Sequence, residues 1–128
     1  MTHLTKREEE LGKILVDIAF RIHSKLGPGL LENVYEKVFA SELERLSIPY
    51  EKQKTIPIWF NGKKIENGLR VDLLVDDLVI VEIKAQEQFH PVWEAQLLSY
   101  LKLTGLELGY LINFHVPLIK NGIKRRVL

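Results

Sequence analysis

The hydrophobic pattern of this chain changes its period near residue 49, and the change constrains the order of its elements. From residue 7 to 26, apolar residues recur at intervals of three and four, which predicts an amphipathic helix. Gly27-Pro28-Gly29 should end that helix, and the same periodicity predicts a second helix from about residue 30 to 46. After Pro49 the pattern becomes that of β-strands.

Strands dominate the second half. Asn61-Gly62 is a strong hairpin signal, and Pro57 places the strand before it near a sheet edge. Pro91 is suited to begin a helix that Gly105 ends. The expected fold is α/β (α+β), with a central mixed sheet flanked by helices in the order helix, helix, three strands, helix, two strands. The expected ranges are strands at 55–60, 69–75, 78–85, 108–114 and 123–127, and a helix at 92–104.

The length and composition narrow the class of protein. A chain of 128 residues suits one domain, residues 1–128, with a hydrophobic core. There are no cysteines, which excludes disulfides and thiolate chemistry, leaves oxygen ligands for a metal and suits the cytoplasm. No apolar run is long enough to span a bilayer.

The net charge of +1 does not indicate a nucleic-acid binder, so phosphate contacts would have to come from local patches. A charged tail is more often a solvated end. The densest basic patch is C-terminal: Lys120, Lys124, Arg125 and Arg126.

Three charged residues stand in two apolar strands. Glu82 and Lys84 share one strand face, roughly 6.5 Å apart, and Asp72 lies in the preceding strand. Buried charges need partners, and a metal ion is a natural partner for two carboxylates. An isolated Glu-x-Lys is more simply explained as a salt bridge.

Asp72 followed by Glu82-Ile83-Lys84 resembles the signature of PD-(D/E)xK nucleases, and the element order is similar to theirs. The resemblance implies that Asp72, Glu82 and the Ile83 backbone carbonyl hold Mg²⁺ or Mn²⁺. Lys84 would orient or deprotonate the attacking water. Gln96, on the next helix, resembles the glutamine of many of these nucleases, although a satisfied core amide explains it equally well. Nucleic acid, with DNA favoured, would be hydrolysed.

Gly29-Leu30-Leu31-Glu32-Asn33-Val34-Tyr35 is similar to the motif of the GxxExxY protein family, which is grouped with this superfamily. The resemblance implies that Glu32 completes the metal site, although a carboxylate in a first helical turn is also favoured by the helix dipole. Tyr35 is expected to pack in the core, and Tyr100 to support the site. His90 and His115 have no partner at ligand spacing.

The site depends on strand register. A two-residue turn at Asp76-Asp77 would place Asp72 opposite Val81, with Asp72 and Glu82 on opposite faces. We therefore expect a three-residue turn or a β-bulge that brings the two acids together.

Two other functions remain open at this point. In the first, the chain is a nucleic-acid-binding or regulatory module that does not cleave. In the second, it is an interaction subunit that requires a partner. A homodimer would supply the larger cleft that duplex DNA needs.

Overall fold

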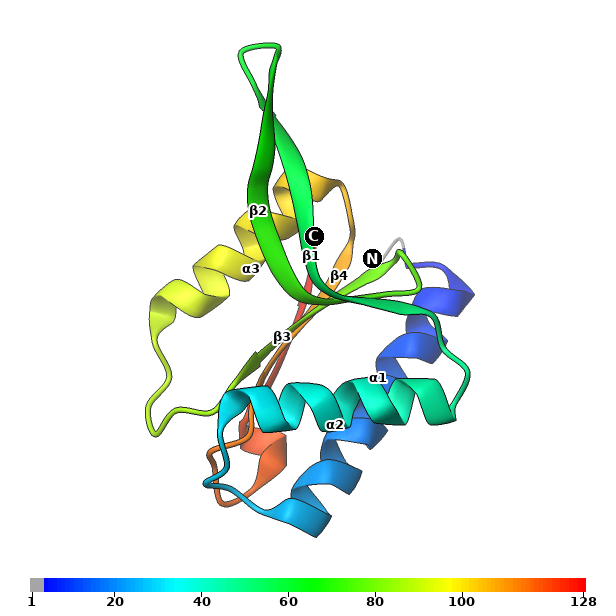
Figure 1. The fold of residues 1–128 in the computed structure, drawn as a ribbon, viewed down its shortest axis with the longest axis vertical. Coiled ribbons are helices and arrows are strands. Elements are labelled where there is room, and N and C mark those ends of the chain that lie inside the picture. Colours follow the sequence, from blue (N-terminus) through cyan, green and yellow to red (C-terminus); the bar gives the residue numbers. More distant parts are fainter. Residues whose placement is uncertain (1–3) are drawn as a thin grey trace.

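The computed structural model describes residues 4–128 (Figure 1). The elements follow the predicted order, with one short 3₁₀ helix added before the last strand. They are α1 (Lys6–Leu26), α2 (Glu32–Arg45), β1 (Tyr50–Phe60), β2 (Lys63–Val75), β3 (Val79–Lys84), α3 (Pro91–Thr104), β4 (Leu108–Asn113), η1 (Ile119–Asn121) and β5 (Ile123–Val127). No helix in this described part is long and apolar enough to cross a membrane.

The five strands form one mixed sheet in sequence order, β1-β2-β3-β4-β5. β3 and β4 are parallel because α3 connects them as a crossover, and the other neighbours are antiparallel. β3 is central, and β1, which contains Pro57, forms an edge, as predicted. The α/β fold with helices on both sides of the sheet is thus confirmed.

Two hydrophobic clusters lie on the two faces of the sheet. The larger joins α1 and α2 to alternate residues of β3 such as Val81 and Ile83. The smaller joins α3 to residues of the opposite parity, such as Leu74 and Ile80. Because side chains alternate along a strand, Glu82 and Lys84 share the parity of Ile80 and belong to the α3 face.

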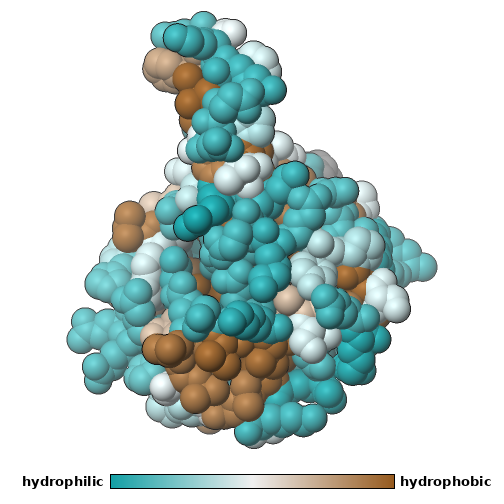
Figure 2. All heavy atoms as spheres, viewed as in Figure 1, coloured by the Kyte–Doolittle hydropathy of each residue, from teal (hydrophilic) through white to brown (hydrophobic). Residues whose placement is uncertain are grey.

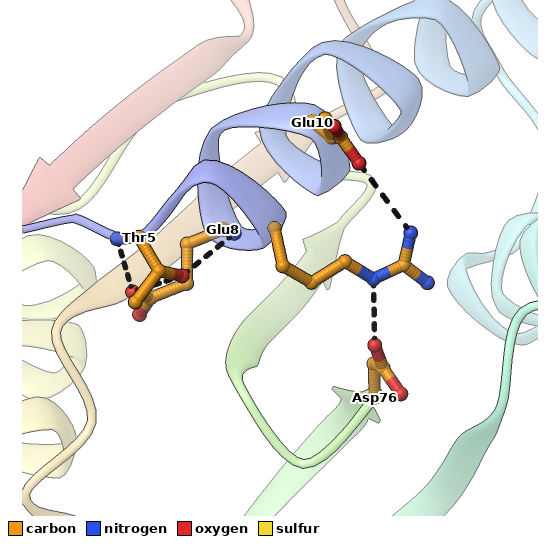
Figure 3. Close-up of polar contacts among 5 residues, drawn as sticks. Thr5, Glu8, Glu10 and Asp76 are labelled. Carbon is orange, nitrogen blue, oxygen red and sulfur yellow. Dashed lines mark hydrogen bonds and ion pairs between the residues drawn. The ribbon is translucent and has the colours of Figure 1, made fainter.

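The connection between β2 and β3 has three residues, Asp76-Asp77-Leu78, as the register argument required. Val75 pairs with Val79, and both aspartates have positive φ, 52° and 55°. Arg7 on α1 donates from Nε to the Asp76 carboxylate at 2.9 Å, which fixes the turn against the helix (Figure 3).

The first turn of α1 is closed by a capping box, also drawn in Figure 3. Glu8 N–H donates to the Thr5 hydroxyl at 3.1 Å, and Thr5 N–H donates to the Glu8 carboxylate at 2.9 Å. The N-terminal end of the helix that holds the turn is therefore itself well defined.

β1 and β2 continue beyond the rest of the sheet as a projecting hairpin (Figure 1). Phe60 pairs with Lys63 across Asn61-Gly62, whose φ values of 51° and 74° are those of a type I′ turn. Both strands are longer than the apolar pattern predicted. The added residues, 50–54 of β1 and 63–68 of β2, are mostly exposed, so hydrophobic periodicity gave no signal there.

Candidate active site

The two acids lie side by side where the ladder between β2 and β3 ends. The last paired residues are Leu73 and Val81, and one further step in that register places Asp72 opposite Glu82. Side chains replace the next ladder bonds: Ile83 N–H donates to Asp72 Oδ2 at 2.8 Å, and Asp72 N–H donates to Glu82 Oε2 at 3.2 Å. The predicted juxtaposition of Asp72 and Glu82 is confirmed.

β2 also changes its facing at this point. Val71 packs in the cluster under α3, whereas Leu73 packs in the cluster under α1 and α2. Residues two apart normally share a face, so the alternation is interrupted at Asp72. On the neighbouring strand Gln53, which the β1–β2 register places opposite Asp72, has a left-handed φ of 49°. This irregularity in β1 and β2 directs the side chains of Asp72 and Gln53 toward the same point.

Glu82 is only 5% exposed, which determines its chemistry. The pKa of its carboxyl is raised to about 9, mainly by burial and then by the negative charge of Asp72, while the positive charge of Lys84 opposes the shift. Without a cation, the buried carboxyl of Glu82 beside Asp72 therefore holds a proton at neutral pH. A divalent cation would stabilise the ionised form in place of that proton.

Lys84 is half-buried, and its Nζ lies 5.5 Å from the centroid of the Trp93 ring on α3. The aromatic face stabilises the ammonium and holds it on this side of the sheet. Asn113, fully buried on β4, bonds both the N–H and the carbonyl of Gln86. The chain leaving β3 after Lys84 is thus fixed in position.

Glu32 begins α2 beside the end of β3. Burial raises the pKa of its carboxyl, and the positive charge of Lys84 acts in the opposite direction, with Asp72 and Glu36 raising it again. These influences place Glu32 within electrostatic reach of Asp72 and Lys84. Four charged residues from three elements therefore share one centre, called the acidic centre below: Glu32 on α2, Asp72 on β2, and Glu82 and Lys84 on β3.

Two residues that the sequence did not single out also belong to this centre. Gln53 donates from Nε2 to both oxygens of Glu36 at 2.9 and 3.0 Å and approaches Asp72 Oδ1 at 3.4 Å. Glu36 is 9% exposed and lies one turn after Glu32 on α2. The amide of Gln53 thus joins α2 to the acid on β2. The four-residue spacing of two glutamates on α2 is the one signal that would have indicated Glu36.

Gln96 lies differently from the expectation. It is exposed, and α3 packs through Trp93, Leu97 and Leu101. Its Nε2 donates to the Tyr100 hydroxyl at 2.9 Å. Burial raises the pKa of Tyr100, and the charges of Glu82 and Asp72 raise it further, so this ring lies near the acids. Gln96 therefore approaches the centre through Tyr100.

The comparisons with known proteins agree with this geometry. A model of the PD-(D/E)XK nuclease superfamily matches residues 9–126. The chain belongs to the PD-(D/E)XK nuclease superfamily. The comparison with curated proteins gave no match, and neither did the comparison with solved structures.

Nucleases of this superfamily generally use divalent metals, and the donor set fits such an ion. The pair Asp72 and Glu82 supplies hard oxygen ligands, and their mutual repulsion would be relieved by a cation. Within residues 4–128, no three carboxylate or histidine side chains are grouped closely enough to enclose an ion. The remaining ligands would be the Ile83 carbonyl, water, and Glu32 after a side-chain rotation.

Tyr35 is a core residue, as expected. It is fully buried and stacks on Phe114 with ring centroids 4.5 Å apart. Its hydroxyl donates to the Gly27 carbonyl and accepts from Leu30 N–H, which closes the loop between α1 and α2. Gly29 in that loop has a φ of 103°, which favours glycine. The Gly and Tyr of the motif therefore shape the loop that positions Glu32.

The C-terminal basic residues do not form one patch. Lys124 lies over the Phe89 ring, and Arg126 pairs with Glu94 on α3. Arg125 alternates to the other face and lines a cavity beside α1, and Lys120 lies on η1. Phosphate contacts by these residues stay a prediction.

Proposed function

We propose that this protein is a metal-dependent nuclease that hydrolyses phosphodiester bonds of nucleic acid, with DNA as the favoured substrate. The observation that carries the proposal is the pair of half-buried Asp72 and buried Glu82 beside Lys84 in a member of the PD-(D/E)XK nuclease superfamily. A Mg²⁺ or Mn²⁺ ion bound there would polarise the phosphodiester and neutralise charge that develops in the transition state.

Each residue of the centre has a proposed role. Asp72, Glu82 and the Ile83 carbonyl supply oxygen ligands, and Glu32 adds a ligand or positions a water molecule. Lys84 Nζ orients the attacking water and, when neutral, accepts its proton. The oxygen of this water forms a new bond to phosphorus, and one ester P–O bond breaks. Gln96 and Tyr100 support the site from α3.

We also propose that the chain is of the GxxExxY type. Gly29 with its positive φ, Glu32 beside the acids, and Tyr35 bonded to the same loop support that assignment. A homodimer, also proposed, would widen the surface available to a duplex.

The test is incubation of the protein with labelled single- and double-stranded DNA and RNA in Mg²⁺ or Mn²⁺. Lys84→Ala should lower cleavage by about 10²- to 10⁴-fold because it removes the group that orients or deprotonates the water. Lys102→Ala, an exposed lysine on α3, is the matched control and should cleave as wild type does. Equal cleavage by Lys84→Ala and wild type would indicate a contaminating nuclease.

Metal binding gives a second test. Asp72→Asn should weaken Mg²⁺ binding in calorimetry. In metal-free buffer it should raise stability at alkaline pH, where Glu82 is ionised and the substitution removes its charge repulsion with Asp72. Equal affinity in the two proteins would contradict the ligand assignment.

A non-cleaving nucleic-acid-binding module is the second candidate. One observation favours it: among the described residues, no three metal-binding side chains already lie close enough together to hold an ion. Absence of cleavage on all four substrates, together with retained binding, would select it.

A further inference from the structure

The projecting hairpin, residues 50–70, is called the arm below. It has a larger net positive charge than the chain as a whole. It contains five basic and two acidic residues, a net charge of +3, whereas the whole chain has +1. The rest of the protein therefore has a net charge of −2. Lys54 and Lys64 pair with Glu51 and Glu66 of the arm, in exposed ion pairs of the weak kind that a phosphate can replace. Within residues 4–128, Lys52, Lys63 and Arg70 make no salt bridge, so their charge is available to a ligand.

Two aromatic rings project from the tip of the arm. Trp59 is 64% exposed and Phe60 is 68% exposed, although burial is the favoured state of such rings. The strand register pairs Trp59 with Lys64 and Phe60 with Lys63. Successive residues point to opposite faces, so each face of the tip presents one ring beside one lysine. Figure 2 shows the arm as mainly hydrophilic, with hydrophobic side chains gathered near its tip.

Rings beside cations on an exposed hairpin are the chemistry that binds single-stranded nucleic acid. Unpaired bases stack on aromatic faces regardless of sequence, and lysine or arginine contacts the phosphates. In a duplex the flat base faces are covered by their neighbours, so the rings favour a single strand. A second copy of this chain, which would present the same positive arm, is disfavoured by charge repulsion.

The arm leads directly to the acidic centre. Arg70 lies two residues before Asp72 on β2. Burial and the charges of Glu82 and Asp72 raise the pKa of Tyr100, and the positive charge of Arg70 opposes that rise, so the same ring lies near the acids and near Arg70. Ile58 packs in the cluster under α3, so the face that carries Phe60 is the face of the acids. Phe60 stands seven residues beyond Gln53, about 23 Å of strand at 3.3 Å per residue.

We propose that the arm binds a single-stranded segment of nucleic acid and delivers it to the acidic centre. Trp59 and Phe60 stack on unpaired bases, and Lys63, Lys64 and Arg70 contact phosphates. A stacked strand would need about seven nucleotides to reach from the tip to Asp72, at about 3.4 Å per nucleotide. The inference rests on the proposed function only for what happens at the centre, because binding by the arm needs no cleavage.

The test measures binding of a labelled oligonucleotide of about 20 nucleotides, longer than the span just estimated, in metal-free buffer where cleavage does not occur. Trp59→Ala and Phe60→Ala should each weaken binding by about 5- to 150-fold. Phe20→Ala, at an exposed phenylalanine on α1, is the matched control and should bind as wild type. The exposed positions of Trp59 and Phe60 allow the variants to fold, which circular dichroism checks.

Charge is tested separately. The slope of log affinity against log salt concentration should become shallower by about 1.4 in Lys63→Gln/Lys64→Gln, because two phosphate contacts are lost. The paired control, Lys13→Gln/Lys25→Gln on α1, should keep the wild-type slope. A duplex of the same sequence should bind more weakly than the single strand.

The outcomes separate this inference from the proposed nuclease function. Cleavage by wild type with unchanged binding in the arm variants would overturn the arm inference and leave the nuclease proposal standing. Arm-dependent binding without cleavage of any substrate would support the inference and contradict the nuclease proposal. A dimer that dissociates in Trp59→Ala, with single-strand affinity unchanged, would assign the arm to self-association and overturn the inference. Tighter binding of the duplex would also overturn it.

Discussion

The raised pKa of Glu82 predicts an unusual dependence of stability on pH in metal-free buffer. The folded state holds a proton on Glu82 up to about pH 9, whereas the unfolded chain releases it near the ordinary value of 4.5. Stability from this group is therefore complete below pH 4.5 and is lost as pH rises toward 9. The slope is about 1.4 kcal/mol per pH unit, so raising pH from 6 to 8 should lower the free energy of unfolding by roughly 2–3 kcal/mol.

Glu82→Gln isolates this contribution. Glutamine keeps the shape of the side chain and has no proton to release. The free energy of unfolding, measured by urea denaturation with a chelator present, should fall more steeply with pH in wild type than in the variant. Glu87→Gln, at an exposed position in the loop after β3, should follow wild type. Parallel pH profiles of wild type and Glu82→Gln would refute the reasoning.

The same proton should compete with the metal ion. If Mg²⁺ binds to the ionised pair, Glu82 must release its proton first. The Mg²⁺ affinity of wild type should then rise by up to tenfold per pH unit below about pH 9, measured by calorimetry. An affinity that does not change with pH would show that Glu82 is already ionised in the free protein.

Three further predictions concern groups around the site and in the core. Tyr35→Phe should destabilise the fold by about 1–3 kcal/mol in urea denaturation, because the Gly27 carbonyl and Leu30 N–H lose their partner. Glu42 has a pKa of about 2, held down by hydrogen bonds from Arg45 and Arg21, so its stabilisation is present above about pH 4.5 and lost toward pH 2. Melting temperatures of Glu42→Gln should therefore fall less on acidification than those of wild type. Gly109→Ala should destabilise by about 1–3 kcal/mol by the same urea assay, since the new Cβ would lie 2.7 Å from Leu97 Cδ1.

The strand register could be predicted because the side-chain period of a strand is two. Asp72 and Glu82 can share a face only if the connection has an odd number of residues or a bulge. The structure has a three-residue turn at Asp76–Leu78. The alternation of side chains along β2 is also interrupted at Asp72, because Val71 and Leu73 point to opposite faces of the sheet. The alternation of side chains along each strand, together with the requirement that both acids share one site, therefore predicted the register.

The contribution of Gln53 could not be predicted, because it depends on contacts across long separations in sequence. Its amide bonds Glu36, 17 residues earlier, and Asp72, 19 residues later. Gln53 also has a positive φ, which glutamine rarely adopts, and nothing in the neighbouring sequence indicates it. The exposure of Gln96 could not be predicted either. The buried residues of α3 are Trp93, Leu97 and Leu101, and Gln96 lies beside that stripe, where the helical pattern alone did not distinguish exposed from buried.

The departure of β2 from β3 links the acidic centre to the arm. β2 has 13 residues, yet it pairs with β3 only from Leu73 to Val75 and continues with β1 alone. Where the ladder ends, the side chains of Asp72 and Glu82 accept hydrogen bonds from backbone N–H groups, which is why Glu82 can be buried there beside a second acid. Beyond this point the two free strands can bend away and project. If β2 and β3 continued to pair beyond Leu73, backbone hydrogen bonds would replace those that Asp72 and Glu82 accept, and the arm would lie against β3 instead of projecting. The acidic centre and the arm therefore depend on the same break in the ladder.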